Sequence, residues 1–354
     1  MLFAFCSITS CERLNDPSPI YTYDVPDSSQ GEFLVSSLEA EGVDEPLIVE
    51  MTNLIVREEY KRIDGVLIIR NNKLIYESYF HGYSNDVLHN TFSVGKSITS
   101  ILVGIAIDKG FMESVNTPVV QLLPEYQSFQ NPDVRKNDIT VEDLLNMTSG
   151  LDCEDWYQHT EEQMQQTSDW VKFTFDLPMV YDPGSHGSYC TGCAVTLGRI
   201  IENQSGLSLQ EFANRYLFHP LNIIEYQWHI MPDGKASGGG LLFLRPRDMA
   251  KLGLLMLNDG MHNDEQILSK AWVEQCGLNK IKLAGPFDGY GYLWWKQRFS
   301  DSSEAYFADG NGGQQIFIIP SKALVVVFTG GNVNTSLGLQ NFQIVDSYIL
   351  PGIK

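Results

Sequence analysis

Basic residues are scarce in this sequence. It has 24 lysines and arginines against 44 aspartates and glutamates, and its formal net charge is −20. A protein that binds nucleic acid needs a basic face for the phosphate backbone, so this balance argues against such a partner. Long apolar runs are also missing, because none approaches the ~18 residues that a membrane-spanning helix needs. With 354 residues and a hydrophobic content of 43%, the chain is nevertheless typical of a globular protein with a sizeable core.

Two further scarcities narrow the chemistry. No Gly-x-Ser-x-Gly pentapeptide occurs, which argues against the nucleophile elbow of an α/β-hydrolase. Of the six cysteines, two lie in the N-terminal segment. Cys190 and Cys193 form a C-x-x-C, but the sequence shows neither a second ligand pair for zinc nor a βαβ context for redox chemistry. Three interpretations stay open: a disulfide from Cys153 to Cys190 or Cys193 in an oxidising compartment, buried free thiols such as Cys276, and metal or redox chemistry.

The N-terminus resembles a bacterial export signal. A short apolar run, Leu2–Ile8, leads to Ile-Thr-Ser-Cys, which resembles a lipobox with Cys11 as the lipidated residue. No lysine or arginine precedes the run, so either the true start lies upstream or the resemblance is accidental. We expect residues 1–11 to be the signal, the polar, proline-rich residues 12–31 to be a tether, and 32–354 to be the folded domain. The expected location is periplasmic or membrane-anchored, with lipid as the only membrane contact.

The most informative stretch is Thr91–Ser100. In it, Ser93 and Lys96 form Ser-x-x-Lys just before an apolar run, Ile98–Ile107, that has helical spacing. Residues three apart share a helix face, so Lys96 is expected beside Ser93 in the first turn. A serine hydroxyl needs a neighbouring base to act as a nucleophile, and a lysine can serve if burial lowers its pKa. The pattern therefore predicts a nucleophile and its base.

Segments rich in β-forming residues lie near both chain ends, and the middle of the chain is mostly helical. Two such segments flank the turn Asn71–Lys73, and two flank Pro320–Ala323. Thr140 is placed to cap a helix with an acidic first turn. We predict an α+β fold in which strands from both ends form one antiparallel sheet flanked by helices, with a helical lobe over roughly 110–260. The predicted strands are Gly65–Arg70, Leu74–Phe80, Gly291–Trp295, Ala305–Ala308, Gln315–Ile319 and Leu324–Phe328, and the predicted helices include Thr191–Ser205, Leu209–Leu217, Asp248–Leu257 and Phe342–Leu350.

Two other stretches carry possible chemistry. Asp182–Thr191 is a turn-rich approach to a helix, and it places Tyr189 at the junction. A tyrosine there can relay a proton if a lysine cation stabilises its phenolate, and the alternative is a tyrosine packed in the core. Asp309–Gln315 is glycine-rich and opens a strand. A bare N–H there can serve an oxyanion hole, and the alternative is an ordinary turn.

Taken in order, these motifs resemble the serine β-lactamase-like superfamily over roughly residues 55–350. The nearest branch is that of the class C β-lactamases with the related esterases and 6-aminohexanoate-oligomer hydrolases. The absence of a Ser-Asp-Asn motif argues against class A. The motifs that carry the resemblance are Ser93-x-x-Lys96, the stretch Ile139–Leu151, Pro183–Gly184 leading to Tyr189, Ser237–Gly240 and Gly310–Gln314.

The resemblance implies roles for individual residues. Ser93 corresponds to the acylated nucleophile and Lys96 to its base partner. Tyr189 corresponds to the tyrosine of the family's Tyr-x-Asn motif, and the N–H groups of Ser93 and Gln314 to the oxyanion hole. Further substrate contacts are expected from Thr191, Asn311, Gly312 and Gly313.

Two positions depart from the family pattern. Thr191 replaces the asparagine of Tyr-x-Asn, and it offers a single hydroxyl where an asparagine both donates and accepts. Asn311 replaces the lysine of Lys-Thr-Gly, so the cation that would meet the carboxylate of a β-lactam is missing. Both changes weaken the case for an efficient β-lactamase and leave acyl transfer intact.

The resemblance therefore implies a serine hydrolase that cleaves a small ester or amide through an acyl-enzyme, without metal or cofactor. Esterase, amide-oligomer hydrolase, D-amino-acid peptidase and weak β-lactamase all stay open. The rival is a non-catalytic relative that recognises penicillin or binds cell wall. We expect the pocket wall to come from Leu151–Val180, with Trp156, Tyr157, Trp170 and Phe173 either lining the pocket or lying in the core.

Overall fold

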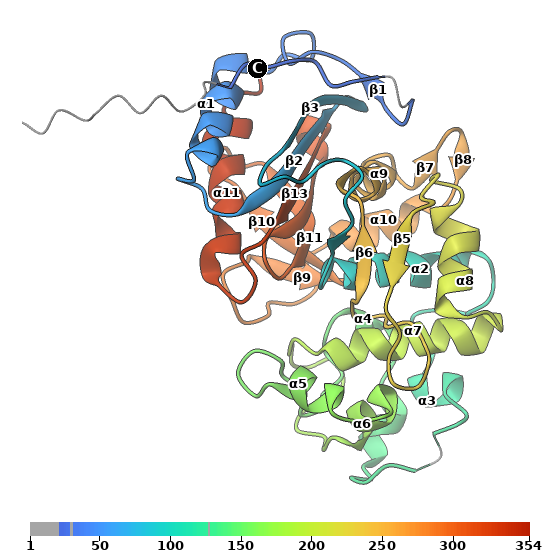
Figure 1. Ribbon diagram of the computed structural model, residues 1–354. Helices are drawn as coiled ribbons and strands as arrows, with labels where there is room; N and C mark the ends of the chain where they lie inside the picture. Colours follow the sequence, from blue (N-terminus) through green and yellow to red (C-terminus); the bar gives the residue numbers. More distant parts are fainter. Residues whose placement is uncertain (1–20, 29–30, 127) are drawn as a thin grey trace, which may run out of the picture.

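The structure is a computed structural model that describes residues 21–28, 31–126 and 128–354. Within these residues, eight strands form one sheet in the order β1-β3-β2-β13-β12-β11-β10-β9 (Figure 1). Neighbouring strands are antiparallel except at the edge, where β1 runs parallel to β3. The strands are β1 (Leu34–Val35), β2 (Ile63–Arg70), β3 (Lys73–Tyr79), β9 (Gly289–Gly291), β10 (Trp294–Arg298), β11 (Glu304–Gly310), β12 (Gln314–Ile319) and β13 (Leu324–Gly330).

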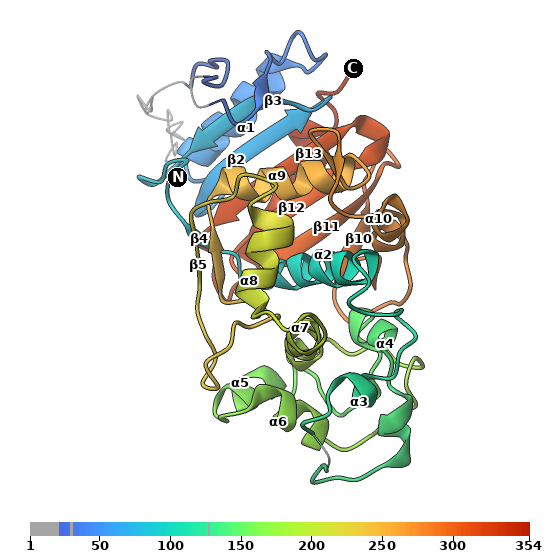
Figure 2. The same ribbon diagram turned by 90° about the vertical axis from the view of Figure 1, so that its right-hand side faces the viewer.

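Helices cover both faces of this sheet (Figures 1 and 2). On one face lie α1 (Glu45–Val56) and α11 (Gln340–Ile344), and on the other lie α2 (Val94–Asp108), α9 (Pro246–Leu257) and α10 (Lys270–Gly277). Alternate residues of β12 serve the two faces: Phe317 packs on Phe342 of α11, whereas Ile316 faces Gly253 of α9. A Cβ on Gly253 would lie 2.5 Å from a methyl carbon of Val325, so this helix needs a glycine to lie so close to the sheet.

The helical lobe is built around α7 (Thr191–Ser205), which is buried along most of its length. A Cβ on Gly192 would overlap Thr174 of α6, so the two helices are in direct contact. The helix ends at Gly206, whose φ of +70° suits a glycine C-cap. The other helices here are α3 (Val119–Leu122), α4 (Val141–Leu145), α5 (Thr160–Gln165), α6 (Trp170–Asp176) and α8 (Leu209–Ala213), which continues as a wider turn over Asn214–Phe218. Short strands complete the chain: β4 (His89–Asn90), β5 (Tyr226–Trp228), β6 (Leu242–Leu244), β7 (Met261–His262) and β8 (Glu265–Gln266).

The predicted architecture is confirmed: β2 from the N-terminal half pairs with β13 near the C-terminus, and a helical lobe comes from the middle of the chain. Asn71 and Asn72 form the predicted hairpin turn, and both have the positive φ that such a turn needs. Thr140 caps α4 as predicted, and the structure shows that it does so in a capping box with Asp143.

Two boundaries were wrong. The predicted strand Gly291–Trp295 is a hairpin instead, because Tyr292 and Leu293 both have positive φ and reverse the chain between β9 and β10. The lobe ends before residue 260, because α9 packs on β13 and β12 rather than on the lobe. The apolar face of α9 predicts a helix, but it does not indicate whether the helix packs on the sheet or on the helical lobe.

The predicted tether is shorter than expected. The backbone N–H of Tyr21 donates to Asn53 of α1, and the Tyr23 hydroxyl donates to the carbonyl of Ile75 in β3. Residues 21–28 therefore include part of the folded domain. Cys11, the signal and the first part of the tether lie outside the described residues. Among the helices of the described residues, none is long and apolar enough to cross a membrane.

Candidate active site

Ser93 and Lys96 meet at the start of α2, as predicted. The Lys96 Nζ donates to the Ser93 Oγ at 2.9 Å and to the Gly239 carbonyl oxygen at 2.9 Å. Gly95 makes this possible, because a Cβ there would lie 2.9 Å from the Cα of Gly240 and would push the glycine-rich segment away. Phe92, just before the serine, has a φ of +47°, a strained value of the kind that gathers at functional sites. The first turn of α2 thus places the amine of Lys96 in hydrogen-bond contact with the hydroxyl of Ser93.

Tyr189 completes this group. Its side chain is buried, and the Lys96 Nζ lies 5.2 Å from the centre of its ring. The ring is stacked near-parallel to Trp156 at 4.9 Å and to Trp295 at 5.7 Å between centroids. The Ser93 side chain is near enough to the phenol to favour a lower pKa of Tyr189. Tyr189 lies 96 positions after Ser93 in the sequence, yet it forms one cluster with Ser93 and Lys96 in the fold.

The charge states differ from our expectation. Burial opposes the charge on Lys96, but Tyr189, Glu161 and Asp155 together outweigh burial, and the pKa of Lys96 is raised. We had expected a lowered pKa, so this is a correction: near neutral pH the lysine is an ammonium group. Burial also raises the pKa of Tyr189, although Lys96 and Ser93 oppose the shift, so the resting phenol is neutral. The two groups titrate as a coupled pair.

Asp155 is a site residue that the sequence analysis missed. Its Oδ2 accepts the backbone N–H of Thr191 at 2.6 Å, and its own N–H donates to the Tyr189 carbonyl. Burial raises the pKa of this carboxyl to about 6, although Lys96 opposes the shift. The site thus holds a buried cation that contacts the serine and a buried acid whose charge acts on that cation.

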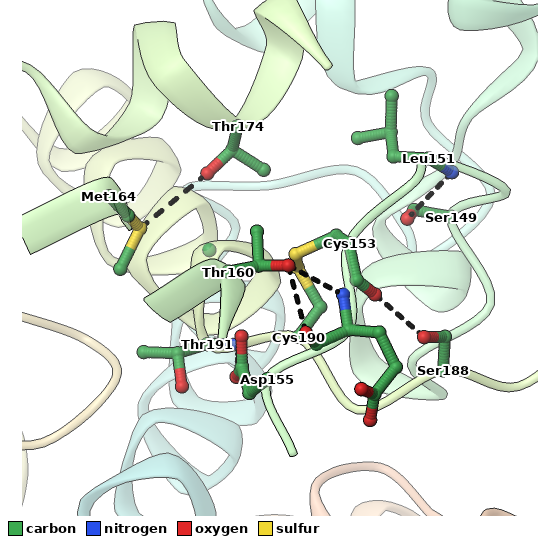
Figure 3. The surroundings of a disulfide bond; sticks show 12 residues. Ser149, Leu151, Cys153, Asp155, Thr160, Met164, Thr174, Ser188, Cys190 and Thr191 are labelled. Atoms are coloured by element: carbon green, nitrogen blue, oxygen red, sulfur yellow. Dashed lines mark hydrogen bonds between the residues drawn. A yellow bond between two sulfur atoms is a disulfide. The ribbon is translucent and has the colours of Figure 1, made fainter. Parts of the chain in front are cut away.

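A disulfide joins the two segments that carry these groups (Figure 3). Cys153 is bonded to Cys190, which confirms one of the two predicted pairings, while Cys193 is a buried free thiol. Tyr189 precedes one half-cystine and Asp155 lies two residues after the other, so the bond holds the tyrosine and the carboxylate near each other. That spacing is the signal that could have identified Asp155. Thr191 begins α7 beside Asp155, as Figure 3 shows.

The glycine-rich turn between β11 and β12 packs against the segment that leads to the serine. A Cβ on Gly310 would lie 2.3 Å from the Thr91 carbonyl oxygen, so the approach requires glycine. Gly312 and Gly313 have φ values of +92° and +93°. The side chain of Gln314 passes close to Gly312 and forms hydrogen bonds with the backbone of Gly330 in both directions. Its role through the backbone N–H stays a prediction.

Asn311 has a different environment from the one we expected. Its Nδ2 donates to Asn334 Oδ1 at 2.6 Å, and its Oδ1 accepts the Asn334 N–H at 2.8 Å. The Asn311 amide is therefore already engaged within the protein, and its expected contact with substrate stays a prediction. The four aromatic residues of the predicted pocket wall lie in different environments. Trp156 stacks on Tyr189, and Tyr157 is 74% exposed. Trp170 and Phe173 pack on the core.

In the described part of the chain, no three His, Cys, Asp or Glu side chains gather as metal ligands would.

Comparison with known proteins places this geometry in a family. The sequence model described as "Beta-lactamase" matches residues 55–338. The chain belongs to the β-lactamase family. Its relatives within this family include hydrolases with quite different substrates in their names.

Two relatives and one solved structure with the same fold show the range. The 6-aminohexanoate-dimer hydrolase of Paenarthrobacter ureafaciens is 25% identical over 311 residues, which covers 79% of this chain and 76% of that protein. Penicillin-binding protein 4 of Amycolatopsis lactamdurans is 23% identical over 320 residues, covering 79% and 82%. The structure of EstCE1, a hydrolase with promiscuous acyltransferase activity, is similar with a TM-score of 0.72 at 16% identity, covering 87% of this chain and all of that one, 100%. The β-lactamase-like fold is thus shared with proteins that are named for different activities.

Proposed function

We propose that this protein is a serine hydrolase that cleaves a small ester or amide through an acyl-enzyme on Ser93. The observation that carries the proposal is the contact of 2.9 Å between Lys96 Nζ and Ser93 Oγ, with Tyr189 against both groups. A structural lysine does not need a serine hydroxyl as an acceptor at the first turn of a buried helix. A nucleophile does need such a partner.

The charge states assign separate tasks to the lysine and the tyrosine. Because Lys96 is protonated at rest, it acts as the cation that stabilises negative charge on the tyrosine or the serine oxygen. For attack, the phenol of Tyr189 first loses its proton to bulk water, and the Lys96 ammonium stabilises the resulting phenolate. This phenolate takes the proton of the Ser93 hydroxyl as the serine oxygen attacks the carbonyl carbon. The same proton then passes to the leaving alcohol or amine, and water repeats the sequence to release the acid. The N–H groups of Ser93 and Gln314 hold the oxyanion.

The charges around the serine favour neutral substrates over β-lactams. A β-lactam carries a carboxylate beside its ring, and Asn311 supplies no cation for it. Asp155 and Glu161 also place negative charge near Lys96, which disfavours a second anion. A charge-assisted hydrogen bond is roughly twice as strong as a neutral one, so its loss matters. Small neutral acyl esters and amides are the proposed substrate class.

We further propose that the protein is exported, with lipid on Cys11. The disulfide between Cys153 and Cys190 supports this, since such bonds persist in oxidising compartments. Mass spectrometry of the mature N-terminus from the native bacterium tests the lipid. An unmodified chain that extends upstream of Cys11 would overturn that part of the proposal.

One set of assays tests the chemistry. Wild type and Ser93→Ala are compared for labelling by a fluorophosphonate and for hydrolysis of a short-chain p-nitrophenyl ester and of nitrocefin. We expect the wild type to prefer the ester, and Ser93→Ala to lose labelling and turnover while folding normally. Asn311→Lys should raise kcat/KM for nitrocefin by a few-fold at most, because the new side chain also gives up the contacts with Asn334. Ester turnover that survives in Ser93→Ala would remove this serine from the mechanism, and a wild type that prefers nitrocefin would make the protein a β-lactamase.

A further inference from the structure

A large cavity lies outside the candidate active site. Its volume is about 990 Å³, and it is bounded by α10, the end of α9 and strands β10 and β11 (Figure 2). Neither Ser93, Lys96 nor Tyr189 is among the residues that line it. Cavities that bind small molecules have volumes of roughly 300–1,000 Å³, so this one is large enough for a ligand of its own.

Lys296 places its amine at the wall of this cavity. The residue lines the cavity and is 8% exposed. It lies opposite Tyr306 in the ladder between β10 and β11, and its Nζ is 5.5 Å from the centre of the Tyr306 ring, which lines the cavity as well. The same Nζ donates to the carbonyl oxygen of Cys276, and the next residue, Gly277 at the end of α10, is also part of the wall. The neighbours of the amine on two sides are thus walls of the cavity.

The hydrogen bonds of this amine leave its lone pair available. Burial lowers the pKa of Lys296 to about 7, so a large part of the amine is neutral near physiological pH. An ammonium group has three N–H donors, whereas a neutral amine has two and a lone pair. Two carbonyl oxygens accept from Nζ, that of Cys276 and that of Trp294 at 3.5 Å. A buried neutral lysine is a nucleophile toward carbonyl groups.

The wall of the cavity indicates the kind of ligand. Apolar side chains, among them Leu257, Val273 and Leu278, suit a hydrocarbon chain. Carboxyl groups line the cavity too, and those of Asp259 and Glu304 form ion pairs with Lys270 and Arg298. Those of Glu274 and Asp288 keep the wall acidic, which disfavours an anionic ligand.

We propose that this cavity is a second ligand site, which takes a small neutral molecule with an apolar chain and an aldehyde or ketone group and holds it as an imine on Lys296. The lone pair attacks the carbonyl carbon and forms the C–N bond, and one amine hydrogen passes to the oxygen, which gives a carbinolamine. The hydroxyl group then leaves with the second amine hydrogen as water, and the C=N bond remains. This condensation needs no oxidant or reductant, and water reverses it. It involves no active-site residue, so it goes beyond the proposed function.

Reductive trapping tests the site. Full-length Ser93→Ala protein, which has no active-site serine to add to an aldehyde, is incubated with hexanal and sodium cyanoborohydride at about pH 7.5. The hydride reduces the imine to a stable secondary amine, and peptide mapping by mass spectrometry locates it. We expect Lys296 to be labelled at least about 10²-fold faster than the exposed Lys270, because the neutral fractions of the two amines differ by on the order of 10³-fold. Equal rates at Lys270 and Lys296 would overturn the inference.

Lys136 is a matched control within the same protein. It is 1% exposed, its Nζ donates to the carbonyl oxygens of Asn131 and Phe175, and burial lowers its pKa. It is not among the residues that line the cavity. We expect it to be labelled no faster than Lys270. Labelling of Lys136 as fast as that of Lys296 would mean that burial alone, without the cavity, produces the reactivity, and would overturn the inference.

Two further comparisons separate a ligand site from a merely reactive amine. A Cβ on Gly277 meets no other atom within 4 Å, so Gly277→Phe adds a ring at the cavity wall without a clash and should slow labelling of Lys296 at least 5-fold, roughly the cost of losing two buried CH2 groups. In the Ser93→Ala parent, the rate at Lys296 relative to Lys270 should be at least about 10-fold greater for hexanal than for acetaldehyde, because each buried CH2 group favours binding by about 4-fold. Unchanged labelling in Gly277→Phe, or the same relative rate for both aldehydes, would show that the amine reacts without a ligand site and would overturn the inference.

Discussion

Two lysines of this protein are both buried but have opposite environments. Lys96 donates to Ser93 and has the phenol of Tyr189 and the carboxyl groups of Glu161 and Asp155 as neighbours, which together raise its pKa. Lys296, on the opposite side of the sheet from Trp295, donates to the carbonyl oxygen of Cys276 at the end of α10. Burial lowers its pKa to about 7 because no carboxylate compensates. Burial alone therefore does not determine the state of a lysine, and its partners do.

The surroundings of Lys296 differ in shape as well. It lines a cavity of about 990 Å³ that is separate from Ser93 and lies between α10, the end of α9 and strands β10 and β11. Its amine lies 5.5 Å from the centre of the Tyr306 ring. No hydroxyl nucleophile forms a hydrogen bond to it among the described residues. Lys296 therefore has no hydroxyl partner to activate among the described residues, whereas the amine of Lys96 contacts a serine oxygen and can support its attack.

The largest expected effect comes from replacing the two lysines themselves, which tests the comparison between them directly. Lys96→Ala should lower kcat/KM for an ester by on the order of 10⁴-fold, as much as loss of Ser93, because members of one catalytic unit are not additive. Lys296→Met should leave kcat/KM within a few-fold of wild type. Steady-state kinetics of both variants and of the double variant Ser93→Ala/Lys96→Ala decide it. A double variant far slower than either single one would show that the two residues act independently.

The next largest effect is expected from the disulfide. This bond supports the surroundings of Lys96 and not those of Lys296. Replacing Cys153 and Cys190 by serine removes a crosslink between residues separated by 37 positions. The loop-closure model then predicts a loss of about 3–4 kcal/mol in the free energy of unfolding. Activity should fall as well, since Tyr189 and Asp155 lose their mutual support. Urea unfolding with and without reductant measures the loss, and Cys276→Ser, near Lys296, is the control that should leave activity unchanged.

The smallest expected effect concerns pH. Unfolded Lys296 keeps its proton up to about pH 10.5, but folded Lys296 releases it above about pH 7. The unfolded state therefore binds more protons between these values, and the free energy of unfolding gains about 1.4 kcal/mol per pH unit as the pH rises. Lys96 has the opposite sign, because a raised pKa contributes stability that is present below pH 10.5 and lost above its folded value.

The free energy of unfolding is measured between pH 7 and 9 for wild type and Lys296→Met, and the difference between them isolates the contribution of Lys296. The wild type should gain stability relative to the variant as the pH rises. A difference that is flat with pH would mean that Lys296 is charged in the fold.

The sequence alone predicted the parts of the site that depend on short spacing. Ser93 and Lys96 meet because three residues make nearly one helical turn, and Tyr189 could be placed by the order of the motifs. Charge states could not be predicted, since the raised pKa of Lys96 depends on Asp155 and Glu161, which reach it only through the fold. The use of Asn311 was missed for the same reason, because its partner Asn334 lies in a loop with no pattern of its own.

The fold shows the same division between local and distant information. Strands, the Asn71–Asn72 turn and most helices were visible in the pattern of apolar and turn residues. The division of Gly291–Trp295 into two strands was not, because Tyr292 and Leu293 are unusual residues for positive φ. Whether α9 packs on the sheet or on the lobe depends on the close contact at Gly253. The periodicity of the sequence indicates only that one face of the helix is apolar.

The pairing of β2 with β13 also imposes an order on folding. Arg70 lies opposite Leu324, so the two central strands of the sheet are separated by most of the chain. During synthesis, β2 and β3 leave the ribosome early and remain an apolar hairpin without its neighbour until β13 follows, whereas the helices of the lobe have their contacts nearby. An incomplete chain that ends before β13 leaves the edge of β2 open, and an open apolar edge is a template for aggregation. The cell therefore has to protect this hairpin for nearly the whole time of translation.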